Sequence, residues 1–395
     1  MKKTLLLLCA CTLVGCASLK NASPEERLAH AHALLKTMPL VDTHVDFPES
    51  LAEHDEWYKP NYTAHALRHP IGDFDYERAR AGGLTVPFMS IYIPSSLQKT
   101  PGRPRQMADS LINMIYAIVQ AYPEKFAHAF GTGDVTRNFA AGKISLPMGM
   151  ENGAPITSVA DVAYFHQRGI RYVTLTHGRD NQICDSSYDT LRTNGGLSPF
   201  GREVVREMNR VGIMVDISHL DDKSAWDVLA VARKPVVATH SGSRFFTPGF
   251  ERNIPDTLIR AVAAQGGVVQ VPFSLYFLSS KSREVYQAIQ KELKNQGLDE
   301  NTDAGRAFIR TEIGRAGFGV SQVADHIDHI KNLVGVEHVG FGADYDGVGR
   351  SLPPDLADVS MYPNLLAELI RRGYSDSDLR KICGGNLLRV WKSNE

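Results

Sequence analysis

Residues 211–241 read VGIMVDISHLDDKSAWDVLAVARKPVVATHS, and this stretch predicts the fold. An apolar run over residues 213–219 ends in a histidine, a helical pattern covers residues 224–232, and a second apolar run over residues 235–240 also ends in a histidine. A strand, a helix and a strand in this order form a parallel pair, because parallel strands need a crossover connection that a helix supplies. Strands that are apolar on successive residues are typical of a sheet buried on both faces.

The same alternation continues on both sides of this stretch. Helical patterns at residues 199–210 and 254–265 separate further apolar runs. The sequence predicts eight strands, at Leu40–Asp46, Leu84–Ile93, Ile144–Glu151, Ile170–His177, Ile213–His219, Pro235–His240, Gly267–Phe273 and His338–Asp344. Strand–helix units repeated in this number predict an α/β protein with a (β/α)8 TIM-type barrel. A doubly wound open sheet is the alternative, and periodicity alone does not exclude it.

The connection between the seventh and eighth strands is longer than a single crossover requires. Residues 282–295 are charged with a helical pattern, residues 297–304 are polar, and residues 320–333 have the pattern of an amphipathic helix. We predict that about residues 276–318 form a helical insertion after strand 7, at the mouth of the barrel.

The N-terminus has the pattern of a secretory signal. Two lysines at residues 2–3 precede an apolar stretch over residues 4–14, which is too short to span a bilayer. The stretch ends in LVGC (13–16), which is typical of a bacterial lipobox, where signal cleavage leaves the cysteine as a diacylated N-terminus. An ordinary signal peptide with an incidental cysteine is the alternative.

This pattern divides the chain into a lipoprotein signal peptide over residues 1–15, a tether and N-terminal helix over residues 16–38, and a single barrel domain over residues 39–395. Ala17, not aspartate, follows the cysteine, so no inner-membrane retention signal is evident. We therefore expect a lipid on Cys16 to anchor the protein in the outer membrane of the bacterial envelope, facing the periplasm.

Composition limits the partners and the kind of metal site. Lys+Arg 43 against Asp+Glu 44 gives no field that would attract nucleic acid, so no nucleic-acid partner is predicted. The expected signal peptide removes Cys9 and Cys11, which leaves Cys184 and Cys383 besides Cys16. That count excludes a cysteine-based zinc site, so histidines and carboxylates must hold any metal. The sequence leaves open whether Cys184 and Cys383 pair.

Several predicted strands end in a residue that can bind metal or titrate. The carboxyl ends of barrel strands converge on one face, where such enzymes have their active sites. A single histidine at a strand end is more often structural, but several strands with such ends in one barrel favour a shared site. The candidates are His44, Asp46, Glu151, His177, His219, His240 and Asp344.

This set of residue types predicts hydrolytic metal chemistry. Imidazole and carboxylate ligands are typical of zinc or a similar divalent ion. Two neighbouring metals need a shared ligand, and a carboxylate with two oxygens suits that role. Such a pair activates a bridging water as hydroxide and polarises a carbonyl, so we expect hydrolysis of an amide or an ester.

The sequence also resembles the membrane dipeptidase (renal dipeptidase) family, whose members are zinc amidohydrolase-like barrels. The likeness covers nearly all of the chain from about Pro39 onward, in order and with similar spacings. The segments that carry it are VDTHVD (41–46), ERARAGGLTVPFMSIYIP (77–94), GMENG (149–153), YVTLTHGRDN (172–181), GLSPFGREVVREMNRVGIMVDISHL (196–220), PVVATHS (235–241), RNIPD (252–256), VADHIDHI (323–330), VGFGADYDGV (339–348) and GGNLLRVW (384–391).

The resemblance implies two Zn²⁺ per chain. His44 and Asp46 would bind one ion, and His219 and His240 would bind the other. Glu151 would bridge the two ions.

The resemblance also implies roles for residues that do not bind metal. His177 would donate a hydrogen bond to the oxyanion of the tetrahedral intermediate. Arg252 would hold the C-terminal carboxylate of the substrate in a bidentate ion pair, although it could also be an ordinary surface arginine. Asp344 would pass a proton from the water to the leaving amine, with Asp346 as the nearby competitor for this role.

The function implied is that of a zinc-dependent dipeptidase that tolerates a D-residue at the C-terminal position and assembles as a homodimer. Members of the family have a much shorter strand-7 loop, so the resemblance extends to the metal ligands but not to the walls around the substrate. One alternative is a hydrolase of another amide or ester, such as a lactam, a lactone or a peptidoglycan fragment, with the same metal pair. Another is a non-catalytic envelope lipoprotein that uses the barrel to bind a ligand.

Overall fold

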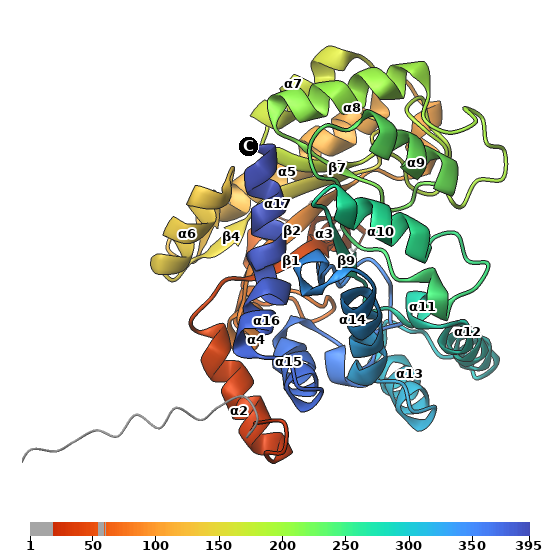
Figure 1. Ribbon diagram of the computed structural model, residues 1–395. Helices are drawn as coiled ribbons and strands as arrows, with labels where there is room; N and C mark the ends of the chain where they lie inside the picture. Colours follow the sequence, from red (N-terminus) through yellow and green to blue (C-terminus); the bar gives the residue numbers. More distant parts are fainter. Residues whose placement is uncertain (1–18, 54–58, 60) are drawn as a thin grey trace, which may run out of the picture.

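The computed structural model describes residues 19–53, 59 and 61–395, and its centre is a barrel of parallel strands surrounded by helices (Figure 1). Each strand pairs with its neighbours in chain order, so the sheet never reverses its strand order. This arrangement confirms the predicted barrel and excludes the doubly wound sheet. The barrel strands are β1 (Leu40–Val45), β2 (Leu84–Tyr92), β5 (Met148–Glu151), β6 (Ile170–Thr174), β7 (Met214–Asp216), β8 (Val237–Ala238), β9 (Val268–Val271) and β10 (Val339–Phe341).

The barrel closes where β10 meets β1, although no regular ladder joins these strands. The Asp344 N–H donates to the His44 carbonyl over 3.2 Å, and the Asp46 N–H donates to the Tyr345 carbonyl over 2.8 Å. A single bridge pairs Val45 with Tyr345. The closure therefore joins the segment that carries His44 and Asp46 to the segment that carries Asp344.

The helices between the strands begin and end at sequence signals. In α8, Ser198 at the N-cap accepts a hydrogen bond from the Gly201 N–H, and Gly212 ends the helix with a φ of 97°. Glycine adopts this left-handed conformation without strain, so the chain turns directly into β7. Helix α8 spans Pro199–Val211, and the other α-helices described outside the insertion after β9 are α2 (Pro24–Leu35), α3 (Phe47–Glu53), α4 (Tyr76–Gly82), α5 (Arg103–Ala121), α6 (Thr132–Ala140), α7 (Val159–Gln167), α9 (Asp222–Val231), α10 (Asp256–Ala264), α14 (Val320–Val334), α15 (Tyr362–Arg371), α16 (Asp376–Arg380) and α17 (Asn386–Asn394).

The predicted third strand, Ile144–Glu151, is wrong as a single element. Pro147 divides it, because proline has no N–H to donate to a ladder. The first part, β4 (Ile144–Leu146), pairs with β3 (Phe126–His128) in a separate two-stranded sheet, and the sequence did not predict β3. Only β5 belongs to the barrel.

Several predicted strands are also too long at their carboxyl ends. The ladders of β6, β7, β8 and β10 stop two or three residues before the candidate histidine or aspartate. These side chains therefore lie in the first residues of the following loops, where the backbone can take conformations that a strand does not allow. His219 and Asp344 have φ angles of 67° and 68°.

The predicted helical insertion follows β9. It consists of α11 (Leu275–Leu278), α12 (Ser280–Asn295) and α13 (Asp303–Arg315), and α14 then resumes the barrel. Figure 1 shows α12 and α13 at the edge of the barrel, beside α11 and α14. The insertion has a small apolar core of its own, formed by Leu275, Tyr286, Ile289, Leu293, Ile309 and Ile313. Both α11 and α12 contact the segment that carries Arg252, through Phe277 and Arg283 respectively.

The described residues settle two smaller points and leave one prediction outside their range. Cys184 and Cys383 are buried free thiols and do not pair. Within the described part of the chain, no helix is long and apolar enough to cross a membrane. The expected signal peptide and Cys16 lie outside the described residues.

Candidate active site

Glu151 lies at the centre of the predicted cluster, at the end of β5. Its Oε2 is 3.4 Å from Nε2 of His44. Its Oε1 is 3.0 Å from Nε2 of His219 and 3.2 Å from Nε2 of His240. One carboxylate oxygen therefore faces the histidine from β1, and the other faces the two histidines that follow β7 and β8.

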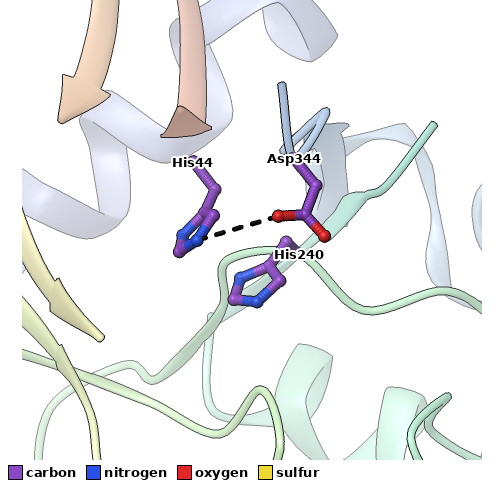
Figure 2. Close-up of side chains that lie close together, drawn as sticks. All are labelled: His44, His240 and Asp344. Carbon is purple, nitrogen blue, oxygen red and sulfur yellow. Dashed lines mark ion pairs between the residues drawn. The ribbon is translucent and has the colours of Figure 1, made fainter. Parts of the chain in front are cut away.

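Two aspartates complete the side of the cluster near β1. Asp46 Oδ2 is 3.4 Å from Nε2 of His44, and Asp344 Oδ1 is 3.9 Å from the same nitrogen. Figure 2 shows Asp344 pointing toward His44, with the His240 imidazole beside them. The His44 and His240 rings stack with centroids 3.8 Å apart. His44 and Asp344, which are 300 residues apart in the sequence, thus meet in one buried cluster.

The donor set and its unmet hydrogen bonds fit a pair of divalent cations. In the part of the chain that the structure describes, three groups of potential ligands have atoms within 4.8 Å of one another: His44, Asp46 and Glu151; Glu151, His219 and His240; and His44, His240 and Asp344. Among the described residues, the buried His44 Nε2 and Asp46 Oδ1 have no hydrogen-bond partner. Buried polar atoms are costly when unpaired, and imidazole and carboxylate are the ligands that zinc-type ions prefer.

The two central carboxylates have opposite protonation preferences. Burial alone raises the pKa of Glu151, but the facing imidazoles of His44 and His177 hold this pKa well below the usual range. Burial raises the pKa of Asp344 well above the usual range, and the nearby Asp46 and Glu151 carboxylates raise it further. Glu151 is therefore suited to remain ionised, whereas Asp344 is suited to carry a proton.

The two histidines that follow β7 and β8 favour the neutral form. Burial, reinforced by the positive charge of Arg252, holds the pKa values of His219 and His240 well below the usual range. A neutral imidazole keeps one nitrogen lone pair, which a metal ion requires.

His177 lies beside this group of buried side chains, on the side that is accessible to solvent. Its Nε2 is 3.6 Å from Glu151 Oε1, and its side chain is 24% exposed. The ring centroid is 4.2 Å from that of His219. Burial lowers the pKa of His177, so it is suited to donate a hydrogen bond as a neutral imidazole. Solvent or a ligand can reach it.

Arg252 is not an ordinary surface arginine, because it is only 2% exposed. Its guanidinium donates to Ser241 Oγ and to His219 Nε2, each over 2.9 Å, and lies 5.1 Å from the centroid of the Phe277 ring in α11. No carboxylate forms an ion pair with it in the described part of the chain. A buried guanidinium without a counter-ion is costly, so this position is suited to an anionic ligand.

Asp346 is the weaker of the two candidates for the proton-transfer role. Its Oδ1 accepts a hydrogen bond from the Asp73 N–H over 2.6 Å, and its own N–H donates to Asp73 Oδ2 over 3.0 Å. The side chain therefore faces Asp73 and not His44.

The next residue, Gly347, lies against the cluster. A Cβ atom at this position would lie 2.1 Å from Asp46 Oδ2, so only glycine fits where this loop passes the cluster.

Sequence reasoning missed residues that orient the candidate ligands. The Tyr172 hydroxyl lies 2.8 Å from Nδ1 of His44, the ring nitrogen that faces away from Glu151. Tyr172 fits only because Gly149 has no side chain, since a Cβ there would lie 2.0 Å from the tyrosine ring. A glycine inside a strand pattern signals such a close approach, but it does not say which residue approaches.

Comparison with known proteins identifies the family. The sequence model of the family described as "Membrane dipeptidase (Peptidase family M19)" matches residues 28–395 of this chain. The chain belongs to the membrane dipeptidase family. It is therefore a metallo-dipeptidase with a candidate binuclear metal site.

Similar proteins and structures cover most of the chain. An uncharacterized dipeptidase of Schizosaccharomyces pombe is 33% identical over 94% of this chain and 84% of its own length. Dipeptidase aclJ of Aspergillus oryzae is 33% identical over 90% of this chain and 78% of its own length. The crystal structure of the probable dipeptidase PvdM from Pseudomonas aeruginosa has 25% identity and a TM-score of 0.79, covering 94% of this chain and 99% of its own.

A further structural relative contains a ligand. It is a metallo peptidase from Rhodobacter sphaeroides bound to a phosphinate mimic of the dipeptide L-Ala-D-Ala. It has 25% identity and a TM-score of 0.75, covering 91% of this chain and 99% of its own.

Proposed function

We propose that this membrane dipeptidase uses two zinc ions to hydrolyse dipeptides. His44 and Asp46 would hold one ion, His219 and His240 would hold the other, and Glu151 would be the ligand that both share. The observation that carries this proposal is the position of Glu151, whose two oxygens face the two histidine groups at 3.0–3.4 Å. A carboxylate held between two such groups is the ligand that a metal pair shares.

When bound, the two ions would supply an activated water and the electrostatic polarisation of the scissile carbonyl. Arg252 binds the C-terminal carboxylate and so orients the dipeptide. His177 donates a hydrogen bond to the carbonyl oxygen as negative charge develops on it. Asp344 takes a proton from the water and returns it to the departing amino group. The position of Asp344 supports this role, because its Oδ1 is 3.9 Å from Nε2 of His44, beside the residues that would hold the ions.

Aromatic side chains form the wall beside the carboxylate-binding position. The Tyr188 ring centroid is 5.9 Å from that of His219 and 6.3 Å from that of Phe250. Phe250 stacks on Phe277 of α11 at 6.3 Å. Tyr188 is 44% exposed, so this wall is at the open end of the site. We propose that it accepts a C-terminal residue of either chirality, and the L-Ala-D-Ala mimic bound to the Rhodobacter sphaeroides relative supports this tolerance.

The proposed function predicts which alanine dipeptides are hydrolysed. We expect L-Ala-L-Ala and L-Ala-D-Ala to be cleaved with kcat/KM values within about tenfold of each other, because a modest change in pocket contacts is worth roughly 1 kcal/mol. A chelator should abolish both activities, and added Zn²⁺ should restore them. Release of free alanine from all four stereoisomers, with and without chelator, measures this. Hydrolysis that continues unchanged after complete removal of metal would contradict the mechanism.

We also propose that the protein is a lipoprotein of the outer membrane, anchored through Cys16 and facing the periplasm. The lipobox-like LVGC at residues 13–16 supports this proposal. In a Gram-negative host, the wild-type protein should be recovered in the outer-membrane fraction. The Cys16→Ser variant should lack the lipid and should be absent from that fraction. Identical fractionation of the two proteins would contradict the anchor.

The homodimer stays a prediction of the family resemblance, and light scattering of the purified protein tests it.

A further inference from the structure

The barrel has its least regular strand pairing at the two places that carry the candidate metal ligands. β7 and β8 share one residue pair, Asp216 with Val237. Between β1 and the segment that follows β10, the described residues form a single bridge, Val45 with Tyr345. We call these places the β7–β8 seam and the β10–β1 seam. His219 and His240 follow the strands of the first seam, whereas His44 lies in β1 and Asp344 follows β10 at the second.

Asp216 lies inside the β7–β8 seam, fully buried. Its Oδ1 accepts hydrogen bonds from the N–H groups of Ser218 and Thr239, both over 2.9 Å. Its Oδ2 accepts from the hydroxyls of Thr239 and Thr174, over 2.6 and 2.5 Å. One carboxylate thus binds donors that follow or belong to β6, β7 and β8, where backbone pairing is sparse.

This network determines which ring nitrogen of His240 carries the proton and which carries the lone pair. Thr239 Oγ1 lies 2.8 Å from Nδ1 of His240. Because the Thr239 hydroxyl gives its only hydrogen to Asp216, it can only accept a hydrogen bond from His240. Nδ1 of His240 must then carry the proton, so the lone pair is on Nε2, the nitrogen that faces Glu151.

Asp42 has the corresponding position in the β10–β1 seam. It is fully buried, and its Oδ1 accepts from the His44 N–H over 2.8 Å and from the Ala343 N–H over 3.1 Å. Its Oδ2 accepts a hydrogen bond from the Tyr362 hydroxyl. Like Asp216, Asp42 accepts from the N–H two residues further along the chain and from an N–H just after the neighbouring strand.

We infer that Asp42 and Asp216 are positioning residues, which close the two seams and thereby fix the metal-binding histidines. Asp42 fixes the backbone of His44 and of the residue before Asp344, while Asp216 fixes the backbone around His219 and, through Thr239, the tautomer of His240. Outer hydrogen bonds of this kind set the orientation and basicity of metal-binding imidazoles. This inference rests on the proposed metal-binding role of the histidines.

Two threonine variants test the Asp216 network without altering a metal ligand. Thr239→Val removes the acceptor for His240 Nδ1–H, whereas Thr239→Ser keeps the hydroxyl. We expect Thr239→Val and Asp216→Asn to lower Zn²⁺ affinity by roughly 10–100-fold at one of the two sites, and Thr239→Ser to remain near the wild-type affinity. Competition with a chromogenic chelator measures both binding constants, and circular dichroism verifies folding.

A matched control separates positioning from general stability. Asp161 is a buried carboxylate that caps α7 by accepting hydrogen bonds from Thr157 and Ser158, away from both seams. Asp161→Asn should lower the denaturant midpoint of the metal-free protein but leave both Zn²⁺ affinities unchanged. If Asp216→Asn and Thr239→Val behave like this control, the positioning role is wrong. If the wild type itself fails to bind two ions, the proposed function fails instead.

Discussion

Replacement of Glu151 by glutamine should leave at most one metal ion per chain and lower kcat/KM for dipeptides on the order of 10³-fold. Glutamine has one amide oxygen and one NH2 group in place of the two carboxylate oxygens, and the NH2 nitrogen cannot bind a cation, so position 151 can then offer an oxygen ligand to only one of the two sides that Glu151 faces. The loss of negative charge also leaves the buried cations less compensated, which in comparable buried pairs costs about 3–5 kcal/mol. Elemental analysis of the purified variant measures the metal content, and dipeptide hydrolysis measures the activity.

A surface glutamate provides the control for this substitution. Glu203 is exposed on α8, and Glu203→Gln should retain two metal ions and full activity. Two tightly bound ions and unchanged turnover in Glu151→Gln would show that the carboxylate does not bridge a metal pair.

Replacement of Arg252 by alanine should lower kcat/KM for dipeptides by about 30- to 5000-fold, chiefly through KM. Removing one partner of a buried, hydrogen-bonded charge pair costs roughly 2–5 kcal/mol. The substrate carboxylate would then enter a buried position without a counter-ion. Steady-state kinetics on a dipeptide and on the corresponding dipeptide amide measures the effect, because the amide has no terminal carboxylate.

The amide substrate also decides between the dipeptidase and a hydrolase of other amides or esters. If Arg252 reads the carboxylate, Arg252→Ala should change the hydrolysis of the dipeptide amide far less than that of the free dipeptide. Arg252→Lys should lie between the wild type and alanine for the free dipeptide, since lysine keeps the charge but not the bidentate geometry. Equal losses on both substrates would contradict the carboxylate-reading role.

The sequence predicted the barrel and the members of the cluster because both follow from local patterns. Apolar runs that end in histidine, aspartate or glutamate are visible without coordinates, and barrel geometry brings their ends together. The break at Pro147 was also readable in principle, since proline interrupts a ladder, but the partner strand β3 has only three residues and no distinctive pattern.

The residues that support the cluster could not be predicted in the same way. Tyr172 and Asp216 lie within strands, and their functions depend on which atoms of neighbouring strands they reach. Asp42 and Asp216 each come shortly before a candidate histidine, yet that spacing alone does not distinguish a hydrogen-bond acceptor from a metal ligand. The burial of Arg252 likewise depends on Phe277, which belongs to the insertion.

The most direct test of the central claim is a crystal structure of the zinc-loaded protein with anomalous diffraction data at the zinc edge. We predict two anomalous peaks, with Glu151 bonded to both, His44 and Asp46 bonded to one, and His219 and His240 bonded to the other. A single peak, or two peaks of which Glu151 contacts neither, would contradict the binuclear site.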